Sequence, residues 1–285
     1  MSVPQRWEPE DADFWTNSGS RLANRNLWLS TGCLMMAFAV WMVWSVITVQ
    51  MQALGFPFSK EQLYSLTAIA GLAGATLRIP QSFVLALSGG RVVIAVTTAL
   101  LLLPAVGLAI ALRSVDTPFG VFAALAALSG LGGGNFASSM ANISLFFPKR
   151  QQGMALGINA GVGNLGLSLM QVALPLVMGV GLFGALGGEP LQSASGKAVW
   201  LQNAGLLWVL PVGLLALLAW LRMNTLPVHA AAAAAPARAV GQVLHLTVLG
   251  LLGTALGVVS LLSGQGPWLV LPTTGIHTTC AASVR

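Results

Sequence analysis

Charge is what this chain lacks most: Asp, Glu, Lys and Arg make up 7% of its 285 residues, whereas hydrophobic residues make up 56%. A soluble domain carries about 25% charged residues. Because so few charges cannot cover a globular surface, the composition excludes an ordinary soluble protein and indicates an integral membrane protein. The formal net charge of +6 then reports membrane topology, and we expect no nucleic-acid partner.

Several kinds of functional site are also missing. The two cysteines, Cys33 and Cys280, do not make a disulfide framework. The histidines show no metal-ligand spacing, and we find no nucleotide-binding loop, no nucleophile beside a base and no paired carboxylates. The sequence therefore predicts no enzyme, no primary pump, no cofactor and no metal. The polar start of the chain does not have the pattern of a cleavable signal peptide, so we expect the first apolar run to stay in the membrane.

Long apolar runs dominate the rest of the sequence. A bilayer is crossed by about 20 apolar residues, and lipid does not tolerate unpaired backbone, so each run predicts a helix. The expected fold is an all-α polytopic membrane protein with a tight turn at GlyGlyArg 89–91. The runs that we expect to span the membrane are 27–54, 63–88, 92–112, 118–147, 152–186 and 198–221.

The runs suggest a simple domain organisation. We predict an N-terminal cytoplasmic segment over 1–26, a six-helix bundle over 27–224, an Ala-rich linker over 225–242 and an atypical apolar tail over 243–285. Whether 243–272 forms a seventh span is left open, because glycines and prolines interrupt it.

Basic residues are shared unequally between the two ends of the predicted helices. Cytoplasmic loops of membrane proteins collect Lys and Arg, which sets the orientation. We therefore expect a multi-pass protein of a bacterial inner membrane with a cytoplasmic N-terminus. The richer side holds Arg6, Arg21, Arg25, Arg91, Lys149, Arg150, Arg222 and Arg238, and the poorer side holds Lys60, Arg113 and Lys197.

Arg78 lies inside the run 63–88, far from either end. A charge at that depth costs several kcal/mol, so such residues usually face a cavity and a partner. No Asp or Glu lies inside any of the apolar runs, which removes the easiest counter-charge. Because the guanidinium offers a planar fork of donors, we hypothesise that Arg78 binds an anion in a membrane transporter. The alternative is a structural arginine paired with a carboxylate or with backbone carbonyls of another helix.

Polar side chains line one face of the run 118–147. They occur at i, i+3, i+4 and i+7 and therefore share a helix face, which we expect to face the bundle. Four glycines between 130 and 134 precede them and form a smooth patch. The polar residues are Asn135, Ser138, Ser139 and Asn142.

The run 152–186 carries glycines at every fourth position. Close helix packing is the ordinary explanation for such a pattern, although a helix that slides or bends during gating would use it too. A second polar stripe, Asn164, Ser168 and Gln171, follows in the same run. We interpret the Trp and Met residues of the chain as lipid-facing or interfacial packing.

The chain resembles the NarK-type nitrate/nitrite porters of the major facilitator superfamily over about residues 7–226. The most specific part is the signature-like stretch GGGNFASSMANISLFFPKRQQGMALGINAGVGNLGLSLMQ (132–171). The shorter stretches that match the same family are WEPEDADFW (7–15), FAVWMVWSV (38–46) and ATLRIPQSF (75–83).

The resemblance implies the six-helix N-terminal half of a major facilitator fold, which moves nitrate or nitrite by alternating access. It implies that Arg78 is the substrate-binding arginine, that Phe136 packs against the planar anion and that Asn164 adds a polar contact. It also implies that several glycines let the fifth helix move, namely Gly157, Gly161, Gly163 and Gly166.

The chain departs from the family because it stops after a first half, and residues 229–285 do not resemble the next two helices of the family. We expect a truncated or frame-shifted product that needs a complementary second half, or a second copy, to surround substrate in the bilayer. A porter for another small anion and a non-transporting, inactive or regulatory half are the alternatives. The six runs hold no Asp, Glu or His, which favours anion exchange over proton symport without deciding between them.

Overall fold

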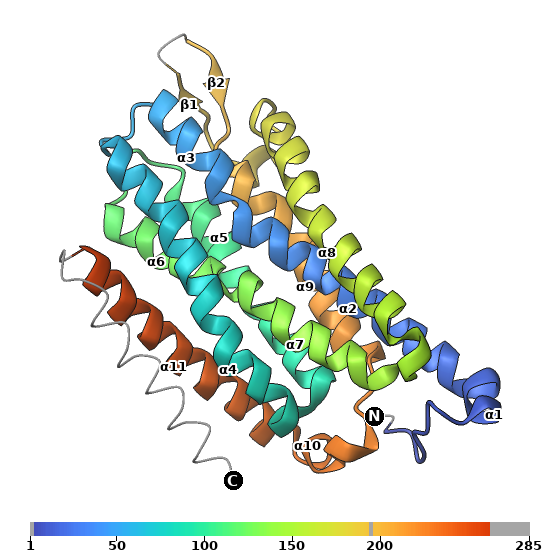
Figure 1. Cartoon of the computed structure of the whole chain (residues 1–285). Coiled ribbons are helices and arrows are strands. Elements are labelled where there is room, and N and C mark those ends of the chain that lie inside the picture. Colours follow the sequence, from blue (N-terminus) through green and yellow to red (C-terminus); the bar gives the residue numbers. More distant parts are fainter. Residues whose placement is uncertain (1–2, 194–195, 263–285) are drawn as a thin grey trace.

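The computed structural model describes residues 3–193 and 196–262, and helices dominate it (Figure 1). The predicted all-α fold is confirmed. The bounds are α1 Ala12–Phe14, η1 Trp15–Gly19, α2 Ser20–Met42, α3 Trp44–Ala53, α4 Lys60–Leu100, α5 Leu102–Ala111, α6 Phe119–Ser129, α7 Leu131–Phe146, α8 Lys149–Met178, η2 Gly184–Leu186, β1 Leu191–Gln192, β2 Ala198–Val199, α9 Asn203–Arg222, η3 Pro227–His229, α10 Ala230–Ala234 and α11 Pro236–Leu262.

Six stretches of the described chain are helical, long and apolar enough to cross a membrane, so this is a multi-pass membrane protein. One of them, Lys60–Ala111, has 52 residues and would measure about 78 Å as a straight helix. That length is more than twice the hydrocarbon core of about 30 Å. The backbone leaves the helical region at Gly89 (φ 70°, ψ 150°), and the ribbon turns back there (Figure 1). Lys60–Ala111 therefore crosses twice, as the predicted turn at 89–91 requires.

Both the backbone conformation and the neighbouring residues require a glycine at position 89. A positive φ of this kind strains any residue with a Cβ, and that atom would lie 3.0 Å from Thr225 Cγ2 and 3.2 Å from His229 Cβ. We expect Gly89→Ala to lower the free energy of unfolding by about 1–3 kcal/mol, measured by thermal unfolding in detergent. Gly71→Ala is the matched control, because Gly71 is helical and no atom lies within 4 Å of a Cβ there. Equal melting temperatures for the two variants would contradict the strain at Gly89.

The last described helix, α11, packs along the outer side of α4 (Figure 1). A Cβ at Gly250 would lie 2.6 Å from Leu77 Cδ2, so this glycine lets the two helices approach. Ser88 Oγ of α4 donates to the carbonyl of Ala239 at 3.1 Å. Helix α11 thus begins at Pro236, inside the segment 225–242 that we predicted as a linker, and Pro236–Ser260 is long and apolar enough to cross the membrane again. Residues 263–285 of the predicted tail lie outside the described residues.

The fifth predicted span is shorter than expected. Helix α8 ends at Met178, not at 186. Gly179 is its C-cap residue, and farther along the chain Gly184 and Gly188 adopt positive φ values outside the right-handed helical region. The chain instead forms η2 and a hairpin in which β1 and β2 pair antiparallel. Asn203 Nδ2 then donates to the carbonyls of Val177 and Val180 at 2.8 and 3.0 Å, which ties the end of α8 to the start of α9.

The N-terminal segment folds against the connection between α7 and α8. Trp7 Nε1 donates to the carbonyl of Leu145 at 3.2 Å, and its ring meets Phe146 edge-on with centroids 5.3 Å apart. Glu10 Oε1 accepts from the backbone N–H of Lys149 at 2.8 Å. Because Lys149 is the first residue of α8, the Glu10 carboxylate caps this helix at its electropositive end.

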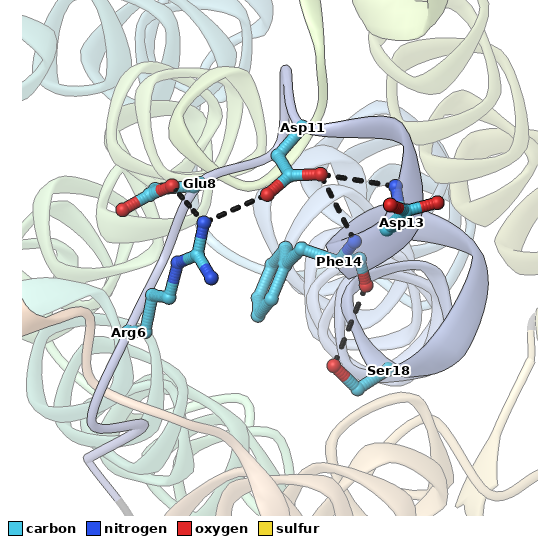
Figure 2. Close-up of polar contacts among 6 residues, drawn as sticks. All are labelled: Arg6, Glu8, Asp11, Asp13, Phe14 and Ser18. Atoms are coloured by element: carbon cyan, nitrogen blue, oxygen red, sulfur yellow. Dashed lines mark hydrogen bonds and ion pairs between the residues drawn. The ribbon is translucent and has the colours of Figure 1, made fainter.

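A small charged cluster holds the shape of this segment (Figure 2). The Arg6 guanidinium lies between the carboxylates of Glu8 and Asp11. Its hydrogen bond to Glu8 lowers the pKa of that carboxyl, so the pair stays ionised at neutral pH. Asp11 Oδ1 accepts from the N–H groups of Asp13 and Phe14 at 3.0 and 3.3 Å and so begins α1.

Candidate functional site

Arg78 lies on α4 where this helix packs against α7. Its Nε donates to the carbonyl oxygen of Gly133 at 3.1 Å, which uses one of the five N–H donors of a guanidinium. Among the described residues, no carboxylate pairs with Arg78 and no hydrogen bond uses its terminal nitrogens. The side chain is exposed at the surface of the bundle. The end of the guanidinium fork is therefore available to a ligand.

Aromatic rings hold the Arg78 guanidinium from two helices. Its Cζ lies 5.3 Å from the ring centre of Phe136 on α7 and 5.8 Å from that of Trp41 on α2. Phe38 completes the cluster, since its ring stacks on Trp41 at 5.8 Å and lies 6.1 Å from Phe136. These rings stabilise the cation by their π faces and leave no counter-charge beside it. The structure thus brings together Arg78 and Phe136, two of the residues that the sequence proposed for the site.

Trp44 is fully buried, so our general interpretation of the tryptophans as lipid-facing or interfacial was wrong for it, while Trp41 is half-buried. Trp41 Nε1 donates to the Ala70 carbonyl at 2.7 Å. Trp44 is fully buried and donates to Ser129 Oγ at 2.8 Å. Their N–H groups find partners inside the bundle, which apolar periodicity does not reveal. Trp28, 58% exposed, does fit the expectation.

Glycines of α7 determine how closely the helices around Arg78 approach. A Cβ at Gly132 would lie 2.1 Å from the Ala37 carbonyl oxygen of α2. Cβ atoms at Gly130 and Gly133 would lie 2.7 and 2.8 Å from the Gly74 backbone of α4. The patch at 130–134 is therefore a packing surface that brings three helices into backbone contact. This contact places the Gly133 carbonyl within reach of Arg78.

The polar stripe of α7 faces the bundle, as predicted: Asn135, Ser138, Ser139 and Asn142 are all buried. Ser138 Oγ donates to Gln81 Oε1 at 3.3 Å, one helical turn from Arg78 on α4. Ser139 Oγ bonds to Ser30 Oγ of α2 at 2.8 Å. Buried hydrogen bonds thus fix α7 against both neighbours behind the Arg78 side chain.

Asn159 is a residue that sequence reasoning missed. It is fully buried on α8, where its Oδ1 accepts from Thr31 Oγ1 of α2 at 3.0 Å and its Nδ2 donates to Ser139 Oγ of α7 at 2.9 Å. Asn159 therefore joins three helices. The sequence feature that could have identified Asn159 is its position five residues before Asn164, which places it on the opposite side of the helix.

Asn164 lies apart from the Arg78 cluster. It is exposed on α8, and its Nδ2 donates to the Ala160 carbonyl of the same helix at 2.9 Å. Ser168 and Gln171 are exposed on the same helix. In the most apolar window of α8, 28% of the window is buried, compared with 61% for the corresponding window of Ala12–Ala53. Helix α8 therefore leaves a broad face uncovered. Within the described residues, the Asn164 side chain bonds to its own helix and makes no hydrogen bond to Arg78.

The glycines of α8 fall into two groups. Gly163 and Gly166 face α2: Cβ atoms there would lie 2.8 Å from Leu34 Cδ2 and 1.9 Å from the Met35 carbonyl oxygen. Gly157 and Gly161 are exposed, and in the described chain no atom from outside their own helix lies within 4 Å of a Cβ at either one. Close packing therefore accounts for the first pair but not for the second.

Comparison with known proteins identifies several that are similar in sequence to this chain. No family model matches the chain. The nitrate/nitrite transporter NarU of Escherichia coli (strain K12) is 46% identical over 246 residues, which cover 86% of this chain and 53% of NarU. The probable nitrate/nitrite antiporter NarK2 of Thermus thermophilus is 42% identical over 228 residues, 79% of this chain and 51% of NarK2. The chain belongs to the family of NarK-type nitrate/nitrite porters. NarU of Salmonella typhimurium (strain LT2) is similar at 45% identity over 246 residues.

The chain spans about half the length of the curated NarK-type porters it matches. Since 86% of the chain is matched, the similarity extends past the stretch 7–226 that carries the resemblance in the sequence. The arrangement in this NarK-type chain has a clear chemical capacity. A guanidinium held by one backbone carbonyl and two rings can bind a small flat anion through its terminal donors. No group of three or more His, Cys, Asp or Glu residues that could hold a metal occurs in the described part of the chain.

Proposed function

We propose that this chain takes part in moving nitrate or nitrite across the membrane by alternating access, with Arg78 binding the anion and Phe136 flanking it. One observation carries the proposal: the Arg78 guanidinium lies between two rings and makes one hydrogen bond, to the Gly133 carbonyl, within the described chain. Nitrate and nitrite are flat, small and singly charged, so they suit a planar fork of donors. The names of the relatives support the same substrates.

The substrate site of this proposal needs a second wall. Arg78 and Asn164 are exposed, and polar groups facing hydrocarbon carry a high free-energy cost. A complementary second half, or a second copy of this chain, would cover both residues and enclose the anion. Asn164 would then reach the anion from α8, and the exposed Gly157 and Gly161 would let α8 slide or bend against the covering half.

The orientation follows from the charges at the two ends of the bundle. The N-terminal segment, the turn at Arg91, the start of α8 and the end of α9 carry most of the basic residues. Because cytoplasmic loops collect Lys and Arg, we place this end in the cytoplasm and the protein in a bacterial inner membrane.

Two other functions compete with this one. A porter for another small anion would use the same guanidinium, since the fork also accepts other oxyanions. A non-transporting regulatory half would keep the fold without enclosing substrate, and the exposed position of Arg78 favours it as the second candidate.

The test is uptake of isotope-labelled nitrate into proteoliposomes that contain the full chain. We expect saturable uptake that unlabelled nitrate or nitrite inhibits and that sulfate or phosphate does not. Vesicles preloaded with nitrite, and vesicles with an imposed proton gradient, separate exchange from proton symport. Competition by sulfate or phosphate would favour a different anion. Absence of uptake by a chain shown to be folded by circular dichroism would favour the non-transporting half.

A further inference from the structure

A small, partly open cavity lies between α2, α7 and the part of α4 that follows the turn at Gly89. Its volume is about 10 Å³, which is the space that one water molecule needs. The residues that line it are Ser30, Cys33, Leu34, Ile94, Thr97, Thr98, Asn135, Ser138 and Ser139. Six of these nine side chains carry an oxygen, although apolar atoms form most of the surface of the cavity.

Two of the lining oxygens have no hydrogen-bond partner among the described residues: Thr98 Oγ1 and Asn135 Oδ1. Thr98 is fully buried and Asn135 is 5% exposed. The Cys33 sulfur lies within reach of the Thr98 hydroxyl, but sulfur is only a weak acceptor. The Cys33 thiol itself is directed to the Leu215 carbonyl, with Sγ 3.7 Å from the oxygen. An unpaired buried polar atom is costly, and nearly all of them in native proteins are paired with protein or with ordered water.

The other hydroxyls of the lining are already engaged. Thr97 Oγ1 donates to the Val93 carbonyl at 2.8 Å, and Ser30 and Ser139 bond to each other. The single hydrogen of Ser138 Oγ has two acceptors within reach, Gln81 Oε1 at 3.3 Å and the Asn135 carbonyl at 3.2 Å. Each of these oxygens still has acceptor capacity, so a guest in the cavity would meet two orphaned groups and additional acceptors.

We propose that this cavity is a binding site for a single structural water molecule, which accepts from the Thr98 hydroxyl and donates to Asn135 Oδ1. One molecule of this size satisfies both groups, and water with two to four polar partners is the ordinary occupant of such a site. The water links Thr98, in the part of α4 that follows the turn at Gly89, to Asn135 of α7, the residue directly before Phe136. It thereby completes the polar core behind the aromatic wall that holds Arg78.

The test compares Thr98→Val with Thr97→Val by thermal unfolding of the full chain in detergent. Valine has nearly the shape of threonine and removes only the hydroxyl. With a bound water, Thr98→Val takes away a hydrogen-bond partner, and we expect the melting temperature to fall by about 2–4 °C. Thr97→Val is the matched control, because the Thr97 hydroxyl bonds only within its own helix turn; we expect a smaller change.

The opposite sign would overturn the proposal. If the cavity is dry, Thr98→Val removes an unsatisfied buried hydroxyl and the melting temperature rises. A second measurement uses the double variant Thr98→Val, Asn135→Leu: groups that share one water show non-additive effects, whereas additive losses would contradict a shared molecule. If sodium ions but not potassium ions restored the lost stability, the occupant would be a cation and not water, and the proposal would likewise be overturned.

Discussion

Replacing Arg78 with alanine is expected to reduce nitrate uptake by about 10- to 100-fold or more. Hydrogen bonds to charged groups contribute about 1.5–3 kcal/mol, and about 1.4 kcal/mol corresponds to a factor of ten. The variant loses the fork and the charge, while the α4–α7 contact keeps its glycine packing at Gly74 and Gly133. The chain should therefore fold without binding the anion. Labelled nitrate uptake into proteoliposomes measures the effect.

Two further variants make this result specific. Arg78→Lys keeps the charge but not the planar fork, so we expect an intermediate loss. Arg113→Ala is the matched control, because Arg113 is exposed and bonds to the carbonyl of Leu186 in η2. Helix η2 shortly precedes β1, which lies at the opposite end of the bundle from the N-terminus (Figure 1). Its uptake should equal that of the unaltered chain. Uptake by Arg78→Ala within a factor of two of the unaltered chain would remove the basis of the proposed function.

Gly166→Ala is expected to destabilise the fold more than any other single methyl addition to α8. The new Cβ would lie 1.9 Å from the Met35 carbonyl oxygen, and this oxygen belongs to the backbone of α2 and cannot rotate away. Overpacking typically costs about 1–3 kcal/mol, and we expect at least the upper end of that range. Loss of ellipticity on heating in detergent measures it.

Gly161→Ala on the same helix is the matched control. Among the described residues, no atom from outside its own helix lies within 4 Å of a Cβ at Gly161. Alanine stabilises a helix by up to about 1 kcal/mol relative to glycine. We therefore expect unchanged or higher stability. If Gly161→Ala also lowers nitrate uptake, the glycine serves motion of α8 against a covering half. Equal destabilisation by both substitutions would show that the packing of α8 on α2 is not as described.

The glycine signature illustrates where sequence reasoning reaches its limit. Four glycines of α8 were assigned one common role by resemblance, yet Gly163 and Gly166 pack on α2 while Gly157 and Gly161 remain uncovered. Spacing along a helix gives the relative angle of two residues, but not which neighbour lies at that angle. The same limit explains why Asn159 was overlooked and why Trp44 was interpreted as lipid-facing or interfacial.

The boundaries of α8 and α11 show a related limit. Hydropathy extended the fifth predicted span to 186, whereas the helix ends at Met178 and the chain beyond it contains the positive-φ glycines Gly184 and Gly188. The Ala-rich stretch before 243 has the composition of a linker, yet α11 begins within it at Pro236, because Ala239 and Gly250 can approach α4 closely. Small residues change a hydropathy profile little, but they determine how closely two helices can approach.

By itself, the sequence determined the membrane class, the succession of helices and the turn at Gly89, and it singled out Arg78 as a candidate anion-binding residue. Each of these follows from segment hydropathy, from a backbone requirement or from a lone charge, which are local properties. Only the tertiary structure decided what surrounds Arg78: the Gly133 carbonyl, the rings of Trp41 and Phe38 and the polar core behind them. These contacts depend on how three helices rotate and approach through their glycines, and that geometry arises from packing between distant segments, not from any one of them.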